Sequence, residues 1–292
     1  MKPLVSVIIP TYKRIEDLNR AIKSVYNQSY KNIEIIVVND DPTLTIQNNI
    51  QLKKNLTFIN HTKNKGGSAA RNSGIRFARG EYLAFLDDDD QFLKFKIEKM
   101  IKKINLLDDE WSGIYSWWIR ERSKKLIKSK IEGDLTLPLL LFNKNLIHGG
   151  TSSLFLRSDV VKSIDGFNTS YHRHQDWELI IRICKKGKIK VIRQPLFIKG
   201  SSEQPSLSAK KILQLKFKLL NQFSSTIESY GNKLARKIYC RQILVIGFHF
   251  LKQKDFLNCL KIFSKTFVFF HSEFFISLFQ IIIYYIKKYG MV

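Results

Sequence analysis

One stretch decides the fold of this chain: Glu81-Tyr82-Leu83-Ala84-Phe85-Leu86-Asp87-Asp88-Asp89-Asp90, in which a short apolar run ends in four carboxylates. Gly80 precedes the run, and an apolar run of this length after a turn residue predicts a buried β-strand. The carboxyl end of this strand therefore carries a dense negative charge.

The four aspartates, residues 87–90, have two interpretations. Ligands bind at the carboxyl ends of strands in open α/β sheets, and crowded carboxylates with hard oxygen atoms favour Mg²⁺ or Mn²⁺. The alternative is a solvated acidic turn that caps a helix beginning near Phe92, since aspartate is a good N-cap. A calcium loop of the EF-hand kind fits less well, because Gln91 and Phe92 stand where a further ligand and a glycine are needed.

The chain before this stretch alternates strands and helices. Continuous apolar and β-branched runs predict strands at residues 4–10, 33–38 and 56–59. Helices are predicted around residues 18–25 and after Pro42, and a glycine-containing turn within residues 64–74 should lead into a third helix that runs to about Ala78. This order predicts a parallel sheet wound with right-handed crossovers.

Polar side chains follow the ends of these strands. Parallel strands end at the same edge of a sheet, so four features should share one crevice: Thr11, Asp40, Arg71 and the aspartates 87–90. The Gly66-Gly67 turn matches neither the G-x-G-x-x-G fingerprint nor the P-loop. A nicotinamide enzyme or an NTPase is therefore not expected.

The next part of the chain is more irregular. A strand is expected at residues 113–119, a turn into another strand over 148–157, and a turn at 165–167. Six basic residues follow the first of these strands and are expected to form a solvated face. They are Arg120, Arg122, Lys124, Lys125, Lys128 and Lys130.

A helix is expected from about residue 175. Apolar residues from Trp177 to Cys184 share one helical face, which places Asp176 at the helix start. A carboxylate there is either favoured simply by the helix dipole or held as a base at the mouth of the crevice. His172 and His174 do not indicate a zinc site, because their spacing is unsuited and carboxylates are scarce nearby.

The whole-chain composition is strongly basic. The 292 residues are 44% hydrophobic, which is typical of a globular protein, but the net charge of +24 predicts a polyanionic partner. Nucleic acid, an anionic membrane surface and phosphate-bearing substrates all satisfy this prediction. Three scattered cysteines indicate a reducing compartment. No signal peptide is expected, since the apolar run at residues 4–10 is short and ends at proline.

Five ordered elements resemble those of the family 2 inverting glycosyltransferases. They are Val5–Tyr12, Val37–Asp40, Asn64–Gly74 with its Ala-Arg-Asn-x-Gly core, Gly80–Asp90, and Gln175–Leu179. The resemblance implies the GT-A fold: an α/β, Rossmann-like domain with a mostly parallel central sheet and flanking helices, here followed by a C-terminal helical extension. It also implies a nucleotide-sugar-binding and catalytic domain over residues 1–205.

The resemblance assigns roles to named residues. Thr11, Asp40 and Arg71 would hold the uridine half of a UDP-sugar donor. Asp87 would contact the ribose, and Asp88 is also assigned to the donor-binding residues.

The same resemblance implies a metal ligand and a catalytic base. Asp89 would bind the Mn²⁺ or Mg²⁺ that bridges the two phosphates, and Asp90, one place further on, would lie behind it. Asp176 would be the base. The family commonly has Glu-Asp at this point, whereas this chain has Gln175, so the charge beside the base is lost. No Q-x-x-R-W element of the processive synthases is present, so transfer of one sugar per encounter is expected.

The last third, residues 206–292, differs in composition. Long helical patterns predominate, and lysines and arginines interleave with aromatic side chains. Residues 267–286 are almost long enough to span a bilayer, but polar residues interrupt them. An in-plane interfacial helix is the favoured interpretation, with a membrane span, or packing on the catalytic domain or a second subunit in a homodimer, as alternatives.

The resemblance implies an enzyme of surface-glycan synthesis. The expected acceptor is a polyprenyl-diphosphate-linked saccharide of an O-antigen, capsule or related polymer, and the expected place is the cytoplasmic face of the bacterial plasma membrane, with peripheral attachment to its anionic surface. The alternative from another class is a metal-dependent nucleic-acid-binding protein or nuclease, which only the charge suggests. The transferase interpretation implies no nucleic-acid partner. The sequence leaves open the sugar, the linkage and the choice between Mn²⁺ and Mg²⁺.

Overall fold

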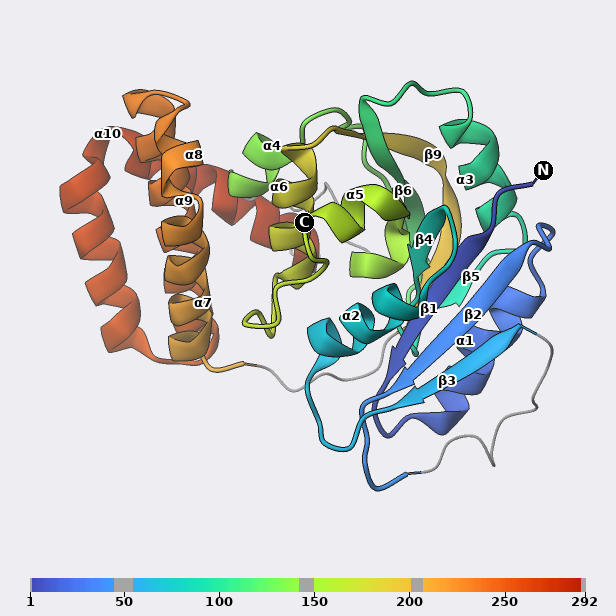
Figure 1. The fold of residues 1–292 in the computed structure, drawn as a ribbon. Helices are drawn as coiled ribbons and strands as arrows, with labels where there is room; N and C mark the ends of the chain where they lie inside the picture. Colours follow the sequence, from blue (N-terminus) through green and yellow to red (C-terminus); the bar gives the residue numbers. More distant parts are fainter. Residues whose placement is uncertain (1, 45–54, 142–149, 201–206, 290–292) are drawn as a thin grey trace. The chain divides into compact units, whose positions relative to one another are not determined.

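The computed structural model describes residues 2–44, 55–141, 150–200 and 207–289 (Figure 1). The chain divides into two compact units. The first comprises Met1–Thr136 and Lys144–Glu203, and the second comprises Leu137–Asn143 and Gln204–Val292. The division near residue 203 coincides with the change in composition in the sequence.

One mixed sheet forms the centre of the first unit. Within the described residues it has nine strands, eight of them in the order β3-β2-β1-β4-β8-β6-β9-β5, with β7 paired to β6. The first four strands in this order are parallel. They are β1 (Val5–Thr11), β2 (Ile33–Asn39), β3 (Leu56–Asn60) and β4 (Tyr82–Phe85). The expected convergence of strand ends is present, since Thr11 lies beside Asn39 and Ile8 beside Phe85.

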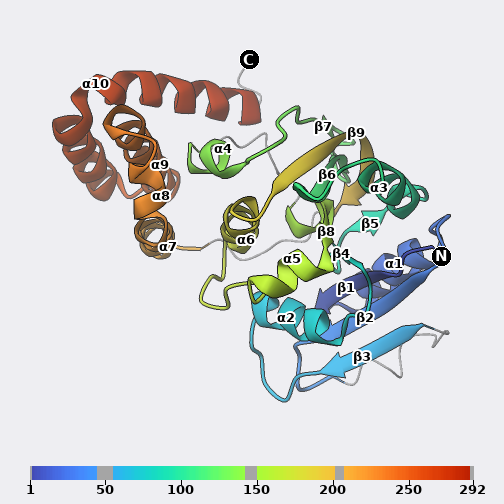
Figure 2. The ribbon, with the colours of Figure 1, turned by 45° about the horizontal axis from the view of Figure 1, so that its top comes forward.

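Two layers of helices cover the sheet (Figure 2). Helices α1 (Ile15–Tyr26) and α3 (Lys96–Ile104) pack on the face that carries Val7 and Ile35. Helices α2 (Gly67–Phe77), α5 (Ser158–Ser163) and α6 (Gln175–Cys184) lie on the other face. Every residue of β1 and β2 is buried, as β-branched runs covered on both faces require.

Helix α2 lies very close to β1. A Cβ added at Gly74 would be 2.4 Å from the side chain of Ile8, so only glycine permits this approach. The contact sets the position of Arg71, one turn earlier on the same helix. The helix expected after Pro42 lies largely outside the described residues.

The second half of the sheet is largely antiparallel. It contains β5 (Gln91–Phe92), β6 (Trp111–Arg120), β7 (Leu126–Ile127), β8 (Leu154–Arg157) and β9 (Lys188–Lys199). A 3₁₀ turn, Gly150–Ser153, precedes β8. Strand β8 pairs antiparallel with both β4 and β6, whereas β6 and β9 are parallel. The end of β6 therefore lies at the same edge of the sheet as the ends of β1 and β4.

The prediction of a helix that begins near Phe92 is wrong. Gln91 and Phe92 form β5, which pairs with Phe197–Ile198 of β9, and α3 begins only at Lys96. Phe92 is buried in the core cluster that also contains Val7 and Ile35. The residue before α3 is Phe95, so the aspartates at 87–90 do not cap a helix, and the alternative interpretation of them fails.

The second unit is helical. It contains α7 (Ala209–Gln222), α8 (Ser224–Glu228), α9 (Asn232–Lys252) and α10 (Phe256–Tyr289), together with most of α4 (Thr136–Leu140). The side chain of Ser208 caps α7 by accepting from Lys211 N–H. Helix α10 bends at Phe270, whose backbone dihedral angles are not helical. Leu244 and Val245 of α9 pack against Phe274 and Ile281 of α10.

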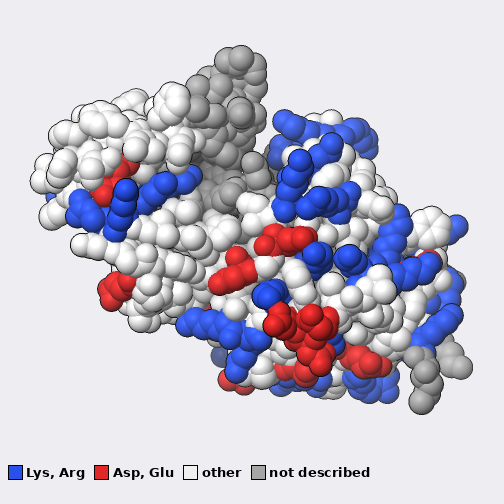
Figure 3. All heavy atoms as spheres, turned by 90° about the horizontal axis from the view of Figure 1, so that it is seen from above, with Lys and Arg blue, Asp and Glu red and all other residues white. Residues whose placement is uncertain are grey.

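One described helix is long and apolar enough to cross a membrane by length and composition. It is the segment Phe256–Ile282 of α10, with a mean hydropathy of 1.3. Large apolar side chains along it are exposed, among them Phe269 and Phe279. Figure 3 shows lysine and arginine side chains spread over much of one face of the molecule, with acidic side chains in a few small groups.

Candidate active site

The loop after β4 brings three carboxylates together. One carboxylate oxygen from each of Asp87, Asp89 and Asp90 lies within 4.8 Å of the other two, and we call these three residues the acid cluster. The loop turns tightly because Asp90 N–H donates to the Asp87 carbonyl at 3.0 Å. Asp87 N–H is in turn held by Ser152 Oγ at 2.9 Å.

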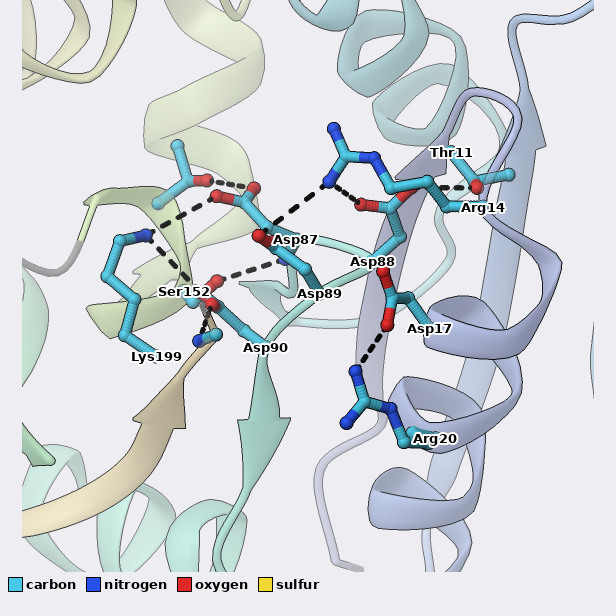
Figure 4. A network of polar contacts seen from close by, with 12 residues as sticks. Thr11, Arg14, Asp17, Arg20, Asp87, Asp88, Asp89, Asp90, Ser152 and Lys199 are labelled. Atoms are coloured by element: carbon cyan, nitrogen blue, oxygen red, sulfur yellow. Dashed lines mark hydrogen bonds and ion pairs between the residues drawn. The ribbon is translucent and has the colours of Figure 1, made fainter. Parts of the chain in front are cut away.

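Two cations flank the aspartates from opposite sides (Figure 4). Lys199, the last residue of β9, places Nζ 3.6 Å from Asp90 Oδ2 and 4.0 Å from Asp87 Oδ2. Arg14, just before α1, places Nη1 3.0 Å from Asp88 Oδ1 and 3.6 Å from Asp89 Oδ2. These contacts offset part of the repulsion among the carboxylates.

The aspartates have different pKa values because their surroundings differ. Burial favours a higher pKa for Asp87, but Arg71 and Lys199 outweigh it and hold the pKa below the ordinary value. Burial raises the pKa of Asp88 to about 6, although Arg14 and Thr11 oppose the shift. Burial raises the pKa of Asp90 to about 7 against the effect of Lys199, with Asp87 and Asp89 adding to the rise. Asp87 is therefore charged at neutral pH, whereas Asp90 readily takes up a proton unless a cation binds.

The donor atoms of the acid cluster fit a divalent cation. All three are carboxylate oxygens, which Mg²⁺ and Mn²⁺ prefer. Asp90 Oδ2 is buried and accepts no hydrogen bond, so its contact with Lys199 Nζ at 3.6 Å leaves it able to accept a closer cation. The sequence predicts Asp89 as the metal ligand with Asp90 behind it, whereas the structure groups Asp90 with Asp87 and Asp89.

Gly200 fixes the position of the loop. Its N–H donates to Asp90 Oδ1 at 2.8 Å. A Cβ added at Gly200 would be 1.9 Å from the carbonyl oxygen of Asp89, so any other residue would push the loop away. The end of β9 thus supplies both a cation and a close backbone contact to the acid cluster.

Arg71 connects α2 to the acid cluster. Its Nη2 donates to Asp87 Oδ1 at 2.5 Å, and Thr151 Oγ1 donates to the same oxygen at 2.9 Å. On its other side, Arg71 Nη1 lies 3.1 Å from the Gln175 side-chain oxygen when the amide is oriented to satisfy its neighbours. Gln175, the neutral residue before Asp176, therefore contacts Arg71.

Asp40 organises the turn before α2. Its carboxylate accepts from Lys65 N–H at 2.8 Å and from Gly66 N–H at 2.7 Å. His61 Nδ1 lies 2.7 Å from Asp40 Oδ1, and His61 Nε2 lies 2.8 Å from Ser73 Oγ on α2. All three side chains in this chain of hydrogen bonds, Asp40, His61 and Ser73, are buried. The predicted donor-binding aspartate therefore also fixes the backbone next to it.

Thr11 and Asp88 contact each other directly. Thr11 Oγ1, at the end of β1, donates to Asp88 Oδ2 at 2.9 Å, and both residues are buried. Their interaction joins the ends of two adjacent parallel strands. Both predicted donor-binding residues thus lie at the edge of the sheet that carries the acid cluster.

Asp176 lies in the first turn of α6 and is half-buried. Burial raises the pKa of its carboxyl group, hydrogen bonds from the backbone N–H groups of Trp177 and Asp176 oppose the rise, and the charges of Lys199 and Asp87 act on it too. Gln175, the residue before Asp176, contacts Arg71, which donates to Asp87, so the start of α6 lies beside the acid cluster. The residue before α6, His174, has a left-handed backbone, φ 61°, which turns the chain into the helix.

Five contacting residues were missed by sequence reasoning: Arg14, His61, Thr151, Ser152 and Lys199. Thr151 and Ser152 carried a usable signal, because polar residues that precede a strand lie at the edge where the neighbouring antiparallel strand ends. Lys199 carried none, since a single lysine at the end of a strand is a common feature.

The sequence matches the family described as Glycosyl transferase family 2 over residues 6–163, more than half of the chain. The chain belongs to glycosyltransferase family 2. This family 2 chain is 36% identical over 200 residues to an uncharacterised glycosyltransferase of Rickettsia typhi, across 64% of this chain and 60% of that protein. It is 33% identical over 199 residues to another from Rickettsia felis, across 32% of that protein. The chain thus spans less than two thirds of these relatives.

A further relative of the family 2 chain has a named activity. WfgD of Escherichia coli is a UDP-Glc:alpha-D-GlcNAc-diphosphoundecaprenol beta-1,3-glucosyltransferase, 27% identical over 252 residues, across 84% of this chain and 93% of that protein.

Two solved structures share the fold of the family 2 chain. S. aureus TarS 1–349 in complex with UDP-GlcNAc gives a TM-score of 0.60 at 17% identity, over 84% of this chain and 81% of that one. The mannosyltransferase PcManGT from Pyrobaculum calidifontis, in complex with GDP-Man and Mn²⁺, gives a TM-score of 0.57 at 14% identity, over 91% of this chain and 75% of that one. The predicted GT-A fold is confirmed.

Proposed function

We propose that this family 2 chain is a metal-dependent inverting glycosyltransferase. It moves one hexose or N-acetylhexosamine from a UDP-sugar to a hydroxyl group of a polyprenyl-diphosphate-linked saccharide in surface-glycan synthesis. The observation that carries the proposal is that Arg71 joins the acid cluster to the start of α6: it donates to Asp87 at 2.5 Å and lies 3.1 Å from Gln175, the residue before Asp176. An inverting transfer needs a base and a diphosphate-binding site at this close range.

The donor is assigned to the edge where β1, β2 and β4 end. Thr11, Asp40 and Arg71 would hold the uridine half, and Asp87 and Asp88 would bind beside them. Asp89 and Asp90, with Asp87, would hold Mn²⁺ or Mg²⁺, and the cation would neutralise charge on the diphosphate leaving group. The donor assignment is supported by TarS, whose structure contains UDP-GlcNAc.

Asp176 acts as the base. Its carboxylate accepts the proton of the acceptor hydroxyl while that oxygen forms a bond to the anomeric carbon. The bond from the anomeric carbon to the diphosphate oxygen breaks, and the electron pair leaves with UDP. Attack on the face opposite the leaving group inverts the anomeric configuration. The raised pKa of Asp176 suits this role, because a base works best when its pKa approaches the working pH.

Lys199 and Arg71 support the leaving group. Both cations already contact the acid cluster, so their charges are in place before the diphosphate charge develops. Preorganised charge of this kind costs no reorganisation during the reaction and is a large contributor to catalysis.

The acceptor class is supported by the names of relatives. WfgD acts on a diphosphoundecaprenol-linked sugar, and a Campylobacter jejuni relative, 38% identical over 108 residues, is named as a GalNAc(5)-diNAcBac-PP-undecaprenol beta-1,3-glucosyltransferase. A lipid-linked acceptor requires an enzyme at the membrane surface. The exposed apolar side chains of α10 and the excess of basic residues suit peripheral attachment to the anionic inner face of the plasma membrane.

The test is a panel of UDP-sugars with Mn²⁺, with and without a GlcNAc-diphosphate-lipid acceptor. We expect acceptor-stimulated release of UDP from one donor and a product of inverted anomeric configuration by NMR. Retention of configuration would contradict the proposal, and so would metal-dependent cleavage of DNA without any UDP release, which the nuclease alternative predicts.

A further inference from the structure

The hairpin formed by β6 and β7 is strongly basic. Residues 120–130, which we call the basic hairpin, contain six basic side chains and one acid, Glu121. The exposed ones are Arg122, Lys124, Lys125, Lys128 and Lys130, and Arg120 is half-buried. Glu121 faces Arg20 of α1, 3.5 Å away. Among the described residues, no carboxylate lies within ion-pair distance of Arg122, Lys124 or Lys125.

The base of the basic hairpin adjoins the acid cluster. Arg120 is the partner of Lys199 in the ladder between β6 and β9, and Glu121 N–H donates to the Lys199 carbonyl at 2.9 Å. Lys199 Nζ in turn contacts Asp87 and Asp90. Adjacent strands are about 4.8 Å apart, so the base of the hairpin is one strand away from the lysine that contacts the acid cluster.

The basic hairpin is an ordered feature with its own contacts. Trp117 Nε1 donates to the Ser129 carbonyl at 2.6 Å, and Tyr115 Oη lies 2.6 Å from Ser129 Oγ. Lys128 Nζ lies over the Trp117 ring, 5.3 Å from its centre. Arg120 N–H donates to the Lys125 carbonyl at 3.0 Å, which closes the tip. The cations are therefore presented on a scaffold and not on a free tail.

The proposed reaction needs a second anion site. The donor diphosphate takes the acid cluster, whose carboxylates tolerate a phosphate group only through a bound cation. A lipid-linked acceptor carries its own diphosphate, which cannot share that site and needs a nearby cationic surface. The basic hairpin is a surface of this kind beside the acid cluster. We propose that the basic hairpin binds the diphosphate group of the lipid-linked acceptor, an inference that rests on the proposed function.

The probe is farnesyl diphosphate, titrated by calorimetry into the whole chain in EDTA, so that no metal links it to the acid cluster. The test variant is Arg122→Gln/Lys124→Gln/Lys125→Gln. The matched control, Lys23→Gln/Lys31→Gln/Lys94→Gln, removes the same charge from exposed positions elsewhere in the first unit. The rescue variant, Arg122→Lys/Lys124→Arg/Lys125→Arg, keeps the charge. We expect at least a tenfold loss of affinity in the test variant and less than a threefold change in the other two.

Two further measurements separate this proposal from others. The affinity for UDP with Mn²⁺ should be equal in all four proteins, because the proposed donor site lies at the ends of β1, β2 and β4; absence of UDP binding in the wild type would instead contradict the proposed function. Equal affinity for farnesyl diphosphate in the test variant and the wild type would overturn the inference. Loss of binding to phosphatidylglycerol vesicles or to single-stranded DNA, with farnesyl diphosphate affinity unchanged, would also overturn it and assign the hairpin to those anions.

Discussion

The Arg71 guanidinium donates to the Asp87 carboxylate across 2.5 Å, and this pair joins helix α2 to the end of strand β4. Both side chains are mostly buried, with 7% and 22% exposed. Loss of one partner leaves the other charge buried without compensation, which costs about 3 kcal/mol or more. The pair also holds the pKa of Asp87 below its ordinary value.

Arg71→Gln should therefore lower both stability and donor affinity. We expect a loss of about 3 kcal/mol in the free energy of unfolding, and weaker UDP binding that worsens as pH falls, because Asp87 then protonates more easily. Urea denaturation and calorimetry at pH 5.5 and 7.5 check this. Arg76→Gln, on the same helix, is the control. Equal effects of the two variants would contradict the role of the pair.

Gly200→Ala should displace the acid cluster. The added Cβ would overlap the Asp89 carbonyl at 1.9 Å, so the loop has to move, and Mn²⁺-dependent UDP affinity should fall at least tenfold. Gly133→Ala is the control, because a Cβ there meets nothing within 4 Å although its φ of 97° is strained. Both variants should lose some stability, but only Gly200→Ala should lose metal-dependent binding. Unchanged binding in that variant would show that the close contact does not position the loop.

His61→Leu should loosen the turn that Asp40 organises. The substitution removes hydrogen bonds to Asp40 and Ser73, and a buried polar group left without a partner costs about 1–3 kcal/mol. We expect faster amide hydrogen exchange at Lys65 and Gly66 and a weaker affinity for UDP, while affinity for the metal alone is unchanged. His172→Leu, an exposed histidine, should do neither. If exchange at the turn stays slow, the hydrogen-bond chain is not what holds it.

Lys216 should make the helical unit more stable at high pH. It is fully buried in α7, its Nζ contacts Gln242 Oε1 at 2.8 Å, and burial lowers its pKa to about 7. The unfolded chain, with an ordinary lysine, binds more protons than the folded chain between pH 7 and about 10.5, so unfolding becomes harder as pH rises.

The matched variant is Lys216→Met. The wild type should gain up to about 4 kcal/mol relative to this variant between pH 7 and pH 10, measured by urea denaturation followed through helical circular dichroism. Lys218→Met, two residues along the same helix and exposed, is the control. A difference between wild type and Lys216→Met that is constant with pH would mean that Lys216 titrates normally.

The parallel half of the fold could be predicted from sequence because its strands are buried on both faces. Runs such as Ile33–Val38 have no polar face, so each is either a buried strand or part of a buried helix. Their short length favours a strand. The ends of β1, β2 and β4 then place Thr11, Asp40 and the aspartates at one edge by geometry alone.

The antiparallel half could not be predicted in the same way. Strand β5 has two residues and exists only because β9 pairs with it, so no local pattern distinguishes it from the start of a helix. The same long-range pairing carries Lys199 and Gly200 to the acid cluster. The contacts of Arg14 with Asp88 and Asp89 likewise depend on tertiary structure, and no spacing of residues in the sequence predicts them.

The most direct test of the account compares donor binding with sugar transfer in Asp176→Asn. The control is Asp159→Asn, which removes another aspartate from the first turn of a helix. We predict that Asp176→Asn binds UDP with Mn²⁺ within about threefold of the wild type but transfers sugar in a single turnover about 10²- to 10⁴-fold more slowly, since only the base is lost. Transfer at the wild-type rate by correctly folded Asp176→Asn would contradict the account.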